Sequence, residues 1–294
     1  MKLHGIFPPL ATPFDHHGDI WKVKVQHNVS KLNLTPVGGY VVGGSTGEVV
    51  MLTNDEMARA WEWVAEASAP EKILIAGTAA EGVRETLERT KRAAGIGYKV
   101  ALVRTPAYYK SVVMKPETQM LFFRAVADQS PVPVLIYNFP QVTGIDLSVE
   151  TIAALAEHPN IIGIKESSGN QEKVQRLALE IKDGFQVLVG QAQTLASALN
   201  AGACGGILGF ANAAPYAAIS IWEAHRTREY AAALDWQKRI SRPARLVTAK
   251  YSIPGLKHAM DLMGYYGGPP RLPLAPIGPD AKREIEEAFQ DIRG

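Results

Sequence analysis

Short apolar runs alternate with longer helical patterns along the whole chain. The short runs are apolar at both odd and even positions, as expected of parallel strands that are buried on both faces. We predict eight such strands, at residues 6–12, 39–42, 73–77, 100–105, 134–137, 161–165, 186–190 and 205–209. This pattern predicts an α/β protein built on a parallel sheet.

Helical patterns fill the segments between the predicted strands. Thr53-Asn54-Asp55-Glu56 has the spacing of a capping box, which predicts that a helix begins there and runs through Trp61 and Trp63. Further helices are predicted at residues 83–94, 117–127, 149–157, 171–181, 194–200 and 215–224.

Strands and helices that alternate in this way form either a closed (β/α)₈ TIM barrel or a doubly wound open sheet. Eight strands suffice to close a barrel, and no linker or change of composition divides the chain, which favours the barrel. We expect residues 1–226 to form it and to contain the active site. Helical patterns at about 227–250, 255–263 and 279–291 indicate that residues 227–294 are a C-terminal helical extension packed on the barrel.

Composition and charge exclude several classes of protein. The 31 Lys and Arg and 29 Asp and Glu give a net charge of +2 without a basic cluster, so we expect no nucleic-acid partner. A membrane partner is not expected either, since no stretch reaches the roughly 18 apolar residues of a span. The single cysteine, Cys204, forms no internal disulfide, and the N-terminus has no apolar signal core; we therefore expect a cytoplasmic, soluble protein.

The ends of the predicted strands supply the candidate chemistry, because barrel active sites lie at the C-terminal ends of the strands. Lys165 follows Ile161-Ile162-Gly163-Ile164, so we expect its amine in the mouth of the barrel with little water around it. A dry environment favours the neutral amine that attacks a carbonyl. Tyr137 ends the preceding strand beside it, where a phenol can transfer protons. The alternatives are a lysine that reaches solvent or pairs with Glu166, and a tyrosine that only caps the core.

The loop after the second strand reads Gly43-Gly44-Ser45-Thr46-Gly47-Glu48. Its hydroxyl and backbone N–H groups could bind a carboxylate. As a nucleotide-binding loop it fails, because it has neither the lysine of a P-loop nor the G-x-G-x-x-G spacing of glycines. A plain turn is the alternative.

Four motifs in order resemble the dihydrodipicolinate synthase/N-acetylneuraminate lyase family over essentially the whole chain. They are this loop, Thr105-Pro106-Ala107-Tyr108-Tyr109, Tyr137-Asn138-Phe139-Pro140 and Gly163-Ile164-Lys165-Glu166-Ser167-Ser168-Gly169. The resemblance implies a class I aldolase or lyase that joins or separates pyruvate and an aldehyde, without a metal or organic cofactor. It also implies a homotetramer or dimer of dimers.

The same resemblance implies roles for individual residues. Lys165 matches the Schiff-base lysine, Tyr137 the proton-relaying tyrosine and Ser45 the hydroxyl residue linked to it. Tyr108 matches a tyrosine that reaches a neighbouring subunit's site. Two substrate-binding residues follow: Thr46 matches a ligand of the pyruvate carboxylate, and Ile207 a residue whose backbone lies against pyruvate.

The second substrate depends on positions that vary. Val142 occupies the place where synthases of the family carry an arginine for the aldehyde's carboxylate, and valine offers no such donor; Arg104 and Lys110 are the alternative cations in reach by sequence. The acidic pair of sialic acid lyases is absent, because Gly190-Gln191-Ala192-Gln193 stands there. Ser130-Pro131-Val132-Pro133-Val134, Ile253-Pro254-Gly255-Leu256-Lys257 and Gly264-Tyr265-Tyr266-Gly267-Gly268-Pro269 resemble 4-hydroxy-2-oxoglutarate aldolases.

Our first hypothesis is therefore retro-aldol cleavage of a 4-hydroxy-2-oxo acid such as 4-hydroxy-2-oxoglutarate. The alternatives are condensation of pyruvate with aspartate semialdehyde and a non-catalytic sensor of 2-oxo acids. His16 and His17, with Asp15 and Asp19, suggest at most a weak metal site, so a metal-dependent aldolase is the mechanistic rival. We interpret Cys204 as a small packing residue.

Overall fold

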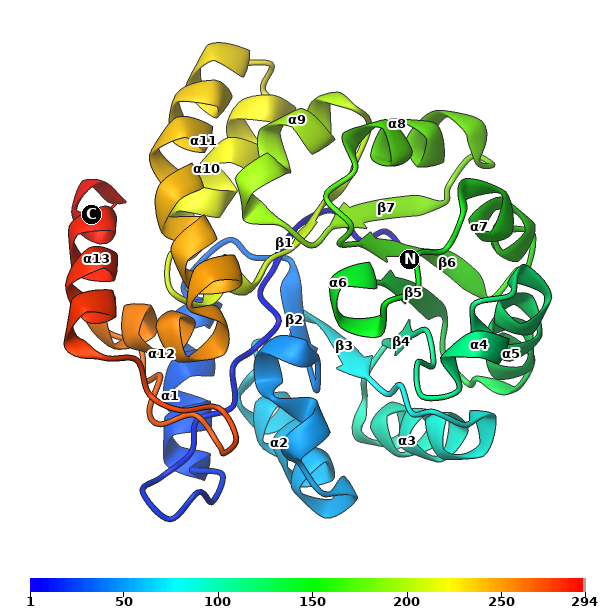
Figure 1. Ribbon diagram of the computed structural model, residues 1–294, viewed down its shortest axis with the longest axis horizontal. Coiled ribbons are helices and arrows are strands. Elements are labelled where there is room, and N and C mark those ends of the chain that lie inside the picture. The colour runs from blue at the N-terminus through cyan, green and yellow to red at the C-terminus, as the bar shows by residue number, and fades with distance from the viewer. Residues whose placement is uncertain (293–294) are drawn as a thin grey trace.

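Eight parallel strands form a ring at the centre of the molecule, with helices around it (Figure 1). The computed structural model describes residues 1–292. The strands are β1 (Gly5–Phe7), β2 (Gly39–Val42), β3 (Ile73–Gly77), β4 (Val100–Arg104), β5 (Val134–Asn138), β6 (Ile161–Glu166), β7 (Gln186–Val189) and β8 (Gly205–Ile207). From β2 to β8 each strand pairs with the next one along the chain, and β8 pairs with β1. A parallel bridge between Pro9 and Val41 joins β1 to β2, so the predicted barrel is confirmed and the open sheet is excluded.

One main helix follows each strand. These helices are α1 (Lys22–Asn33), α2 (Asn54–Ala67), α3 (Val83–Ile96), α5 (Pro116–Gln129), α7 (Val149–Ala156), α8 (Gln171–Glu180), α9 (Leu195–Asn200) and α10 (Pro215–Arg226). Two single-turn helices, α4 (Lys110–Val113) and α6 (Pro140–Thr143), lie in the loops after β4 and β5. The C-terminal region forms α11 (Tyr230–Arg245), a π-helical turn (Leu246–Lys250), α12 (Ser252–Leu262) and α13 (Pro279–Phe289).

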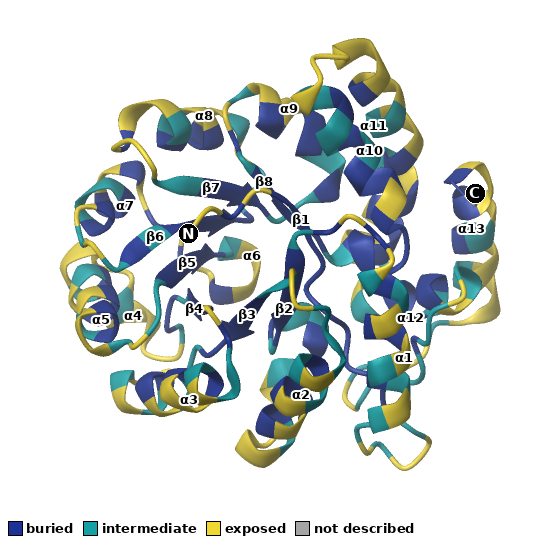
Figure 2. Cartoon of the chain, turned by 180° about the vertical axis from the view of Figure 1, so that it is seen from behind, coloured by how far each residue is buried: buried dark blue, intermediate teal, exposed yellow. Residues whose placement is uncertain are grey.

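Two apolar clusters hold these layers together. The inner one fills the barrel and includes Phe7, Val41, Leu135 and Leu188, with Tyr137 and Ile207 among its members. The outer one lies between strands and helices and extends to Ile285 and Phe289 of α13, so the C-terminal helices share it with the barrel helices. Figure 2 shows the strands as the most deeply buried part of the chain.

Two details differ from the predictions. β1 ends at Phe7 rather than at residue 12, because Pro8 and Pro9 have no N–H with which to continue the ladder. The sequence patterns also did not predict α1. Its buried face carries Asn28 between Val25 and Leu32, so the apolar stripe is broken. Asn28 is tolerated there because its amide exchanges two 2.8 Å hydrogen bonds with the backbone of Tyr266.

The predicted capping box at the start of α2 is confirmed. Thr53 Oγ1 accepts a hydrogen bond of 3.2 Å from the Glu56 N–H, and Glu56 Oε2 accepts one of 2.9 Å from the Thr53 N–H. Glu56 also pairs with Arg271, and this pairing and the cap hold the Glu56 pKa down at about 2 against the opposing effect of burial.

Replacing Thr53 with alanine removes the cap of α2. We expect Thr53→Ala to lower the free energy of unfolding by about 1 kcal/mol in urea denaturation. Thr53→Ser, which keeps the accepting hydroxyl, is the control and should stay close to wild type. Equal losses in both variants would show that the hydrogen bond to Glu56 contributes nothing.

Candidate active site

A cavity of about 570 Å³ opens at the C-terminal ends of the strands. Five of the six residues proposed from the sequence belong to its wall: Ser45, Thr46, Tyr137, Lys165 and Ile207. The remaining wall contains Phe139, Gln141, Val142, Ser167, Gly190, Gln191, Gln193, Gly209, Val247, Thr248, Ala249, Ser252, Ile253 and Leu256. Strand ends far apart in sequence thus meet at one site, as the barrel rule predicts.

Tyr137 of β5 and Lys165 of β6 lie side by side on adjacent strands. Their Cα atoms are register partners, and the Lys165 Nζ lies 4.0 Å from the centroid of the Tyr137 ring. Lys165 is only 4% exposed, although its amine reaches the cavity. The register depends on a bulge at the start of the pair: Val134 is opposite Ile161, but Leu135 is opposite Gly163. Without this bulge, Leu135 would be opposite Ile162 and Tyr137 would be opposite Ile164.

Glu166 does not pair with Lys165. Successive residues of a strand point to opposite faces, so the Glu166 side chain lies outside the barrel. There its carboxylate is fully buried, accepts a 2.9 Å hydrogen bond from Asn138 and lies 3.4 Å from Lys173 Nζ. Lys173 also pairs with Asp146. The alternative that Lys165 is only a structural partner of Glu166 is therefore wrong.

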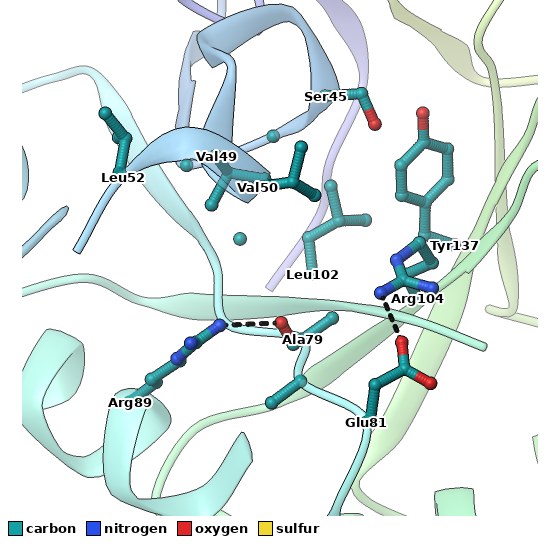
Figure 3. A pocket seen from close by; sticks show the side chains of 14 residues that line it. Ser45, Val49, Val50, Leu52, Ala79, Glu81, Arg89, Leu102, Arg104 and Tyr137 are labelled. Carbon is teal, nitrogen blue, oxygen red and sulfur yellow. Dashed lines mark hydrogen bonds and ion pairs between the residues drawn. The ribbon is translucent and has the colours of Figure 1, made fainter. Parts of the chain in front are cut away.

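Ser45 and Thr46 lie in a single 3₁₀ turn, Ser45–Gly47, that follows β2. Gly209 leaves room for Thr46, since a Cβ added to Gly209 would lie 3.3 Å from Thr46 Oγ1. Ser45 and Tyr137 also line a second, smaller cavity of about 280 Å³. Figure 3 shows both hydroxyls directed toward the same part of that cavity.

Tyr108 lies outside both cavities of this chain. Its side chain is 79% exposed on the loop after β4, and its ring packs edge-on against Tyr109. The contribution of Tyr108 to a neighbouring subunit's site therefore stays a prediction.

Glu81 fixes the loop that carries Tyr108. Its Oε2 accepts hydrogen bonds from the N–H groups of Ala107 (2.7 Å) and Tyr108 (2.8 Å), and its Oε1 lies 2.9 Å from Arg104 Nη2 (Figure 3). Burial raises the Glu81 pKa, but these hydrogen bonds and Arg104 outweigh it, so the pKa is lower than usual. Arg104 is thus engaged in the smaller cavity and does not replace the arginine missing at Val142.

Gly190 provides the space in which Ser167 and Lys165 lie. A Cβ added to Gly190 would be 1.8 Å from Ser167 Oγ and 3.3 Å from Lys165 Cε. The Ser167 hydroxyl is buried without a hydrogen-bond partner among the described residues. A side chain at this position, directly after β7, would therefore displace Ser167 and crowd Lys165.

One wall of the cavity was not predicted from the sequence. Val247, Thr248, Ser252 and Leu256 come from the π-helical turn and from α12, in the region expected to be only an extension. This contact joins residues about 80 or more positions beyond Lys165, so no local pattern reports it. The one available signal was the Ile253–Lys257 motif, which we had used only as a resemblance.

Asp15 of the weak metal site and Cys204 both have local structural partners. Asp15 accepts hydrogen bonds from the backbone of His17 and Asp19, and within residues 1–292 no group of three His, Cys, Asp or Glu residues is placed to hold a metal ion. The Cys204 thiol donates to the carbonyl oxygen of Leu3, and burial raises its pKa to about 11. In the same part of the chain, no helix has the length and apolar character needed to cross a membrane.

The fold and the site have clear relatives. The model of the dihydrodipicolinate synthetase family matches residues 2–292. A 4-hydroxy-tetrahydrodipicolinate synthase from Exiguobacterium is 32% identical over 98% of this chain and 99% of its own. A probable mitochondrial 4-hydroxy-2-oxoglutarate aldolase from Emericella nidulans is 35% identical over 98% of this chain and 94% of its own.

A solved structure is also similar over the whole chain. It is a prophage protein of the dihydrodipicolinic acid synthase family from E. coli K12 in complex with pyruvate, with a TM-score of 0.92 and 26% identity. The alignment covers 100% of this chain and 99% of the E. coli one. A (β/α)₈ barrel with this family match and with synthases and aldolases as relatives defines a lyase or aldolase. The chain belongs to the dihydrodipicolinate synthetase family and is an enzyme of that family.

A methyl group at Gly190 would occupy the space now filled by Ser167 and Lys165. We expect Gly190→Ala to lower the free energy of unfolding by about 1–3 kcal/mol and to slow reductive trapping of pyruvate by borohydride. Gly95→Ala in α3 is the matched control, because a Cβ there meets nothing within 4 Å. It should raise stability by about 0.4–1 kcal/mol and leave trapping unchanged. Normal trapping by Gly190→Ala would contradict the packing described for Lys165.

Proposed function

We propose that this enzyme forms a Schiff base between Lys165 and a 2-oxo acid and releases pyruvate from a 4-hydroxy-2-oxo acid. The observation that carries the proposal is the position of the Lys165 amine, which lies in a cavity beside Tyr137 without an acidic partner among the described residues. Lysine is the side chain that forms Schiff bases with carbonyl substrates.

The reaction begins when the neutral Lys165 amine adds to C2 of the substrate. Tyr137 donates a proton to the departing hydroxyl, so that water leaves and an iminium forms. The C3–C4 bond then breaks, and its electron pair moves into the iminium to give an enamine. The proton of the C4 hydroxyl passes to the Tyr137 oxygen or to a bound water, and an aldehyde is released. Protonation at C3 and hydrolysis of the resulting iminium release pyruvate and the free lysine.

Ser45, Thr46 and Ile207 complete the site in this proposal. Ser45 exchanges protons with Tyr137, which suits two hydroxyl residues that line the same two cavities. Thr46 binds the substrate carboxylate, and the backbone of Ile207 lies against the pyruvate half. None of these steps requires a metal or an organic cofactor.

Tyr108 acts in a neighbouring copy of the chain. Its large exposed ring lies on a loop whose backbone Glu81 holds in place, which is the arrangement expected of a residue that contributes to another subunit. This supports assembly with a second copy, and we propose the homotetramer or dimer of dimers that the family resemblance implies.

The cavity wall lacks the arginine with which synthases of the family bind their second substrate. Val142 lies on the wall with 57% of its surface exposed, and Lys165 is the only charged residue among those that line the cavity within residues 1–292. Synthases of the family bind the carboxylate of aspartate semialdehyde with the arginine that Val142 replaces here, so the wall lacks the residue on which that binding depends. The C5 carboxylate of 4-hydroxy-2-oxoglutarate would be bound by the polar groups of the same wall. The Emericella nidulans relative supports the 4-hydroxy-2-oxoglutarate reaction, whereas the Exiguobacterium relative supports the synthase as a second candidate.

Steady-state kinetics distinguish these candidates. We expect kcat/KM for pyruvate release from 4-hydroxy-2-oxoglutarate to exceed kcat/KM for condensation of pyruvate with aspartate semialdehyde by at least about tenfold. Lys165→Ala should abolish both reactions, and Tyr137→Phe should lower kcat by roughly 10²- to 10⁴-fold, the usual contribution of acid–base catalysis.

Val142→Arg is the matched specificity variant, because it adds the missing guanidinium. It should raise kcat/KM for condensation by about tenfold or more, since a charge-assisted hydrogen bond to the carboxylate of aspartate semialdehyde contributes about 1.5–3 kcal/mol. Faster condensation than cleavage in the wild type would instead assign the synthase reaction. Pyruvate binding without turnover of either substrate would favour the sensor.

A further inference from the structure

A fully buried ion pair lies behind the Ser45–Gly47 turn. Glu48 is the residue after the turn, and its Oε1 lies 2.6 Å from Lys257 Nζ of α12. Both side chains are at most 1% exposed. Buried charges are costly unless they are paired and hydrogen-bonded, so this pair needs a reason.

The backbone of Glu48 shows what the pair holds. Glu48 has φ 58 and ψ 31, the left-handed conformation that residues other than glycine seldom adopt. Such a conformation persists only where the surroundings impose it. The Glu48 N–H closes the turn by donating to Ser45 O at 3.1 Å, so the position of Glu48 determines the shape of the turn that carries Ser45 and Thr46.

Hydrogen bonds to Thr12, Pro269 and Arg271 hold the ion pair and the turn in place. Lys257 Nζ donates to Thr12 O and to Pro269 O, both at 2.9 Å. Thr12 Oγ1 donates to Gly47 O at 2.6 Å, and the Arg271 N–H donates to Glu48 Oε2 at 2.8 Å. Burial lowers the Lys257 pKa, and the neighbouring Glu48 carboxylate opposes that shift.

The helix that carries Lys257 is itself a wall of the cavity. Ser252, Ile253 and Leu256 of α12 line the same cavity as Ser45 and Thr46 of the turn. The ion pair therefore links two walls of one cavity, and Lys257 follows Leu256 directly in the sequence. A change in the pair would move the turn relative to α12 without touching Lys165.

We propose that Glu48 and Lys257 are positioning residues that set Ser45 and Thr46 for the carboxylate of the bound 2-oxo acid. This inference rests on the proposed function, because it requires that Lys165 and the turn bind the same substrate. Neither side chain touches the reacting atoms, so their effect is on substrate binding rather than on the attack by Lys165.

The test uses pyruvate as the probe and compares two buried lysines. Lys257→Met removes the ion pair. Lys72→Met is the matched control: the Lys72 side chain is only 6% exposed, and its amine donates to the carbonyl oxygens of Thr35 (2.8 Å) and Val37 (3.1 Å). It precedes β3 and so lies at the other end of the barrel. For each full-length protein, borohydride is added over a range of pyruvate concentrations, and mass spectrometry measures the trapped fraction and its rate.

We expect Lys257→Met to raise the pyruvate concentration for half-maximal trapping by roughly 10- to 100-fold, as for the loss of hydrogen bonds to a carboxylate. The limiting rate at saturating pyruvate should change by less than about threefold. Lys72→Met should keep the wild-type half-saturation although its stability falls too. Equal half-saturation in wild type and Lys257→Met, or an equal rise in both variants, would overturn the proposal.

A double variant separates positioning from folding. Glu48→Gln combined with Lys257→Met leaves no unpaired buried charge, so it should be more stable to heat than Lys257→Met alone. It still lacks the tie to α12, and its half-saturation should stay raised. A double variant that recovers both stability and half-saturation would show that the pair acts only on folding. Absence of trapping in the wild type would overturn the proposed function itself, and this inference with it.

Discussion

The register between β5 and β6 places the two central residues of the site. The pairing register between two strands determines which residues are side by side. A shift of one residue in that register turns every side chain of a strand to the other face of the sheet. The bulge at Ile162 sets the pairing so that Tyr137 is opposite Lys165, with both side chains inside the barrel. The same alternation sends Glu166 outward, where Asn138 and Lys173 satisfy its carboxylate. Because this acid is engaged elsewhere, the amine of Lys165 remains available in the cavity.

The rest of the site is formed around Tyr137 and Lys165 mainly by close packing and not by charged groups. Gly190 and Gly209 leave room beside Lys165 and Thr46, and the inner apolar cluster with Ile207 forms the base of the cavity. The C-terminal helices contribute one wall and, through Lys257, a contact beneath the Ser45–Gly47 turn. The barrel and the C-terminal helices therefore act together in forming the site.

Much of this arrangement could be predicted from the sequence, because it depends on local patterns. Apolar runs located the strands, and the end of each strand marked Lys165, Tyr137 and the loop after β2. The capping box at Thr53 was equally local. α1 was missed because Asn28 interrupts its buried face, and only a contact with the distant Tyr266 makes that residue acceptable. The wall formed by residues 247–256 and the Glu48–Lys257 pair were missed for the same reason, since each joins segments that are far apart in sequence. The role of Tyr108 depends on a second chain, which neither the sequence nor one folded chain contains.

The central claim is that Lys165 forms a covalent bond with pyruvate, and one measurement tests it directly. The protein is incubated with pyruvate, reduced with borohydride and digested, and the modified peptide is sequenced by mass spectrometry. The account predicts a single reduced pyruvyl adduct on Lys165, and none on Lys257 or Lys173. A folded protein that gives no adduct, or an adduct on another lysine, would contradict the account.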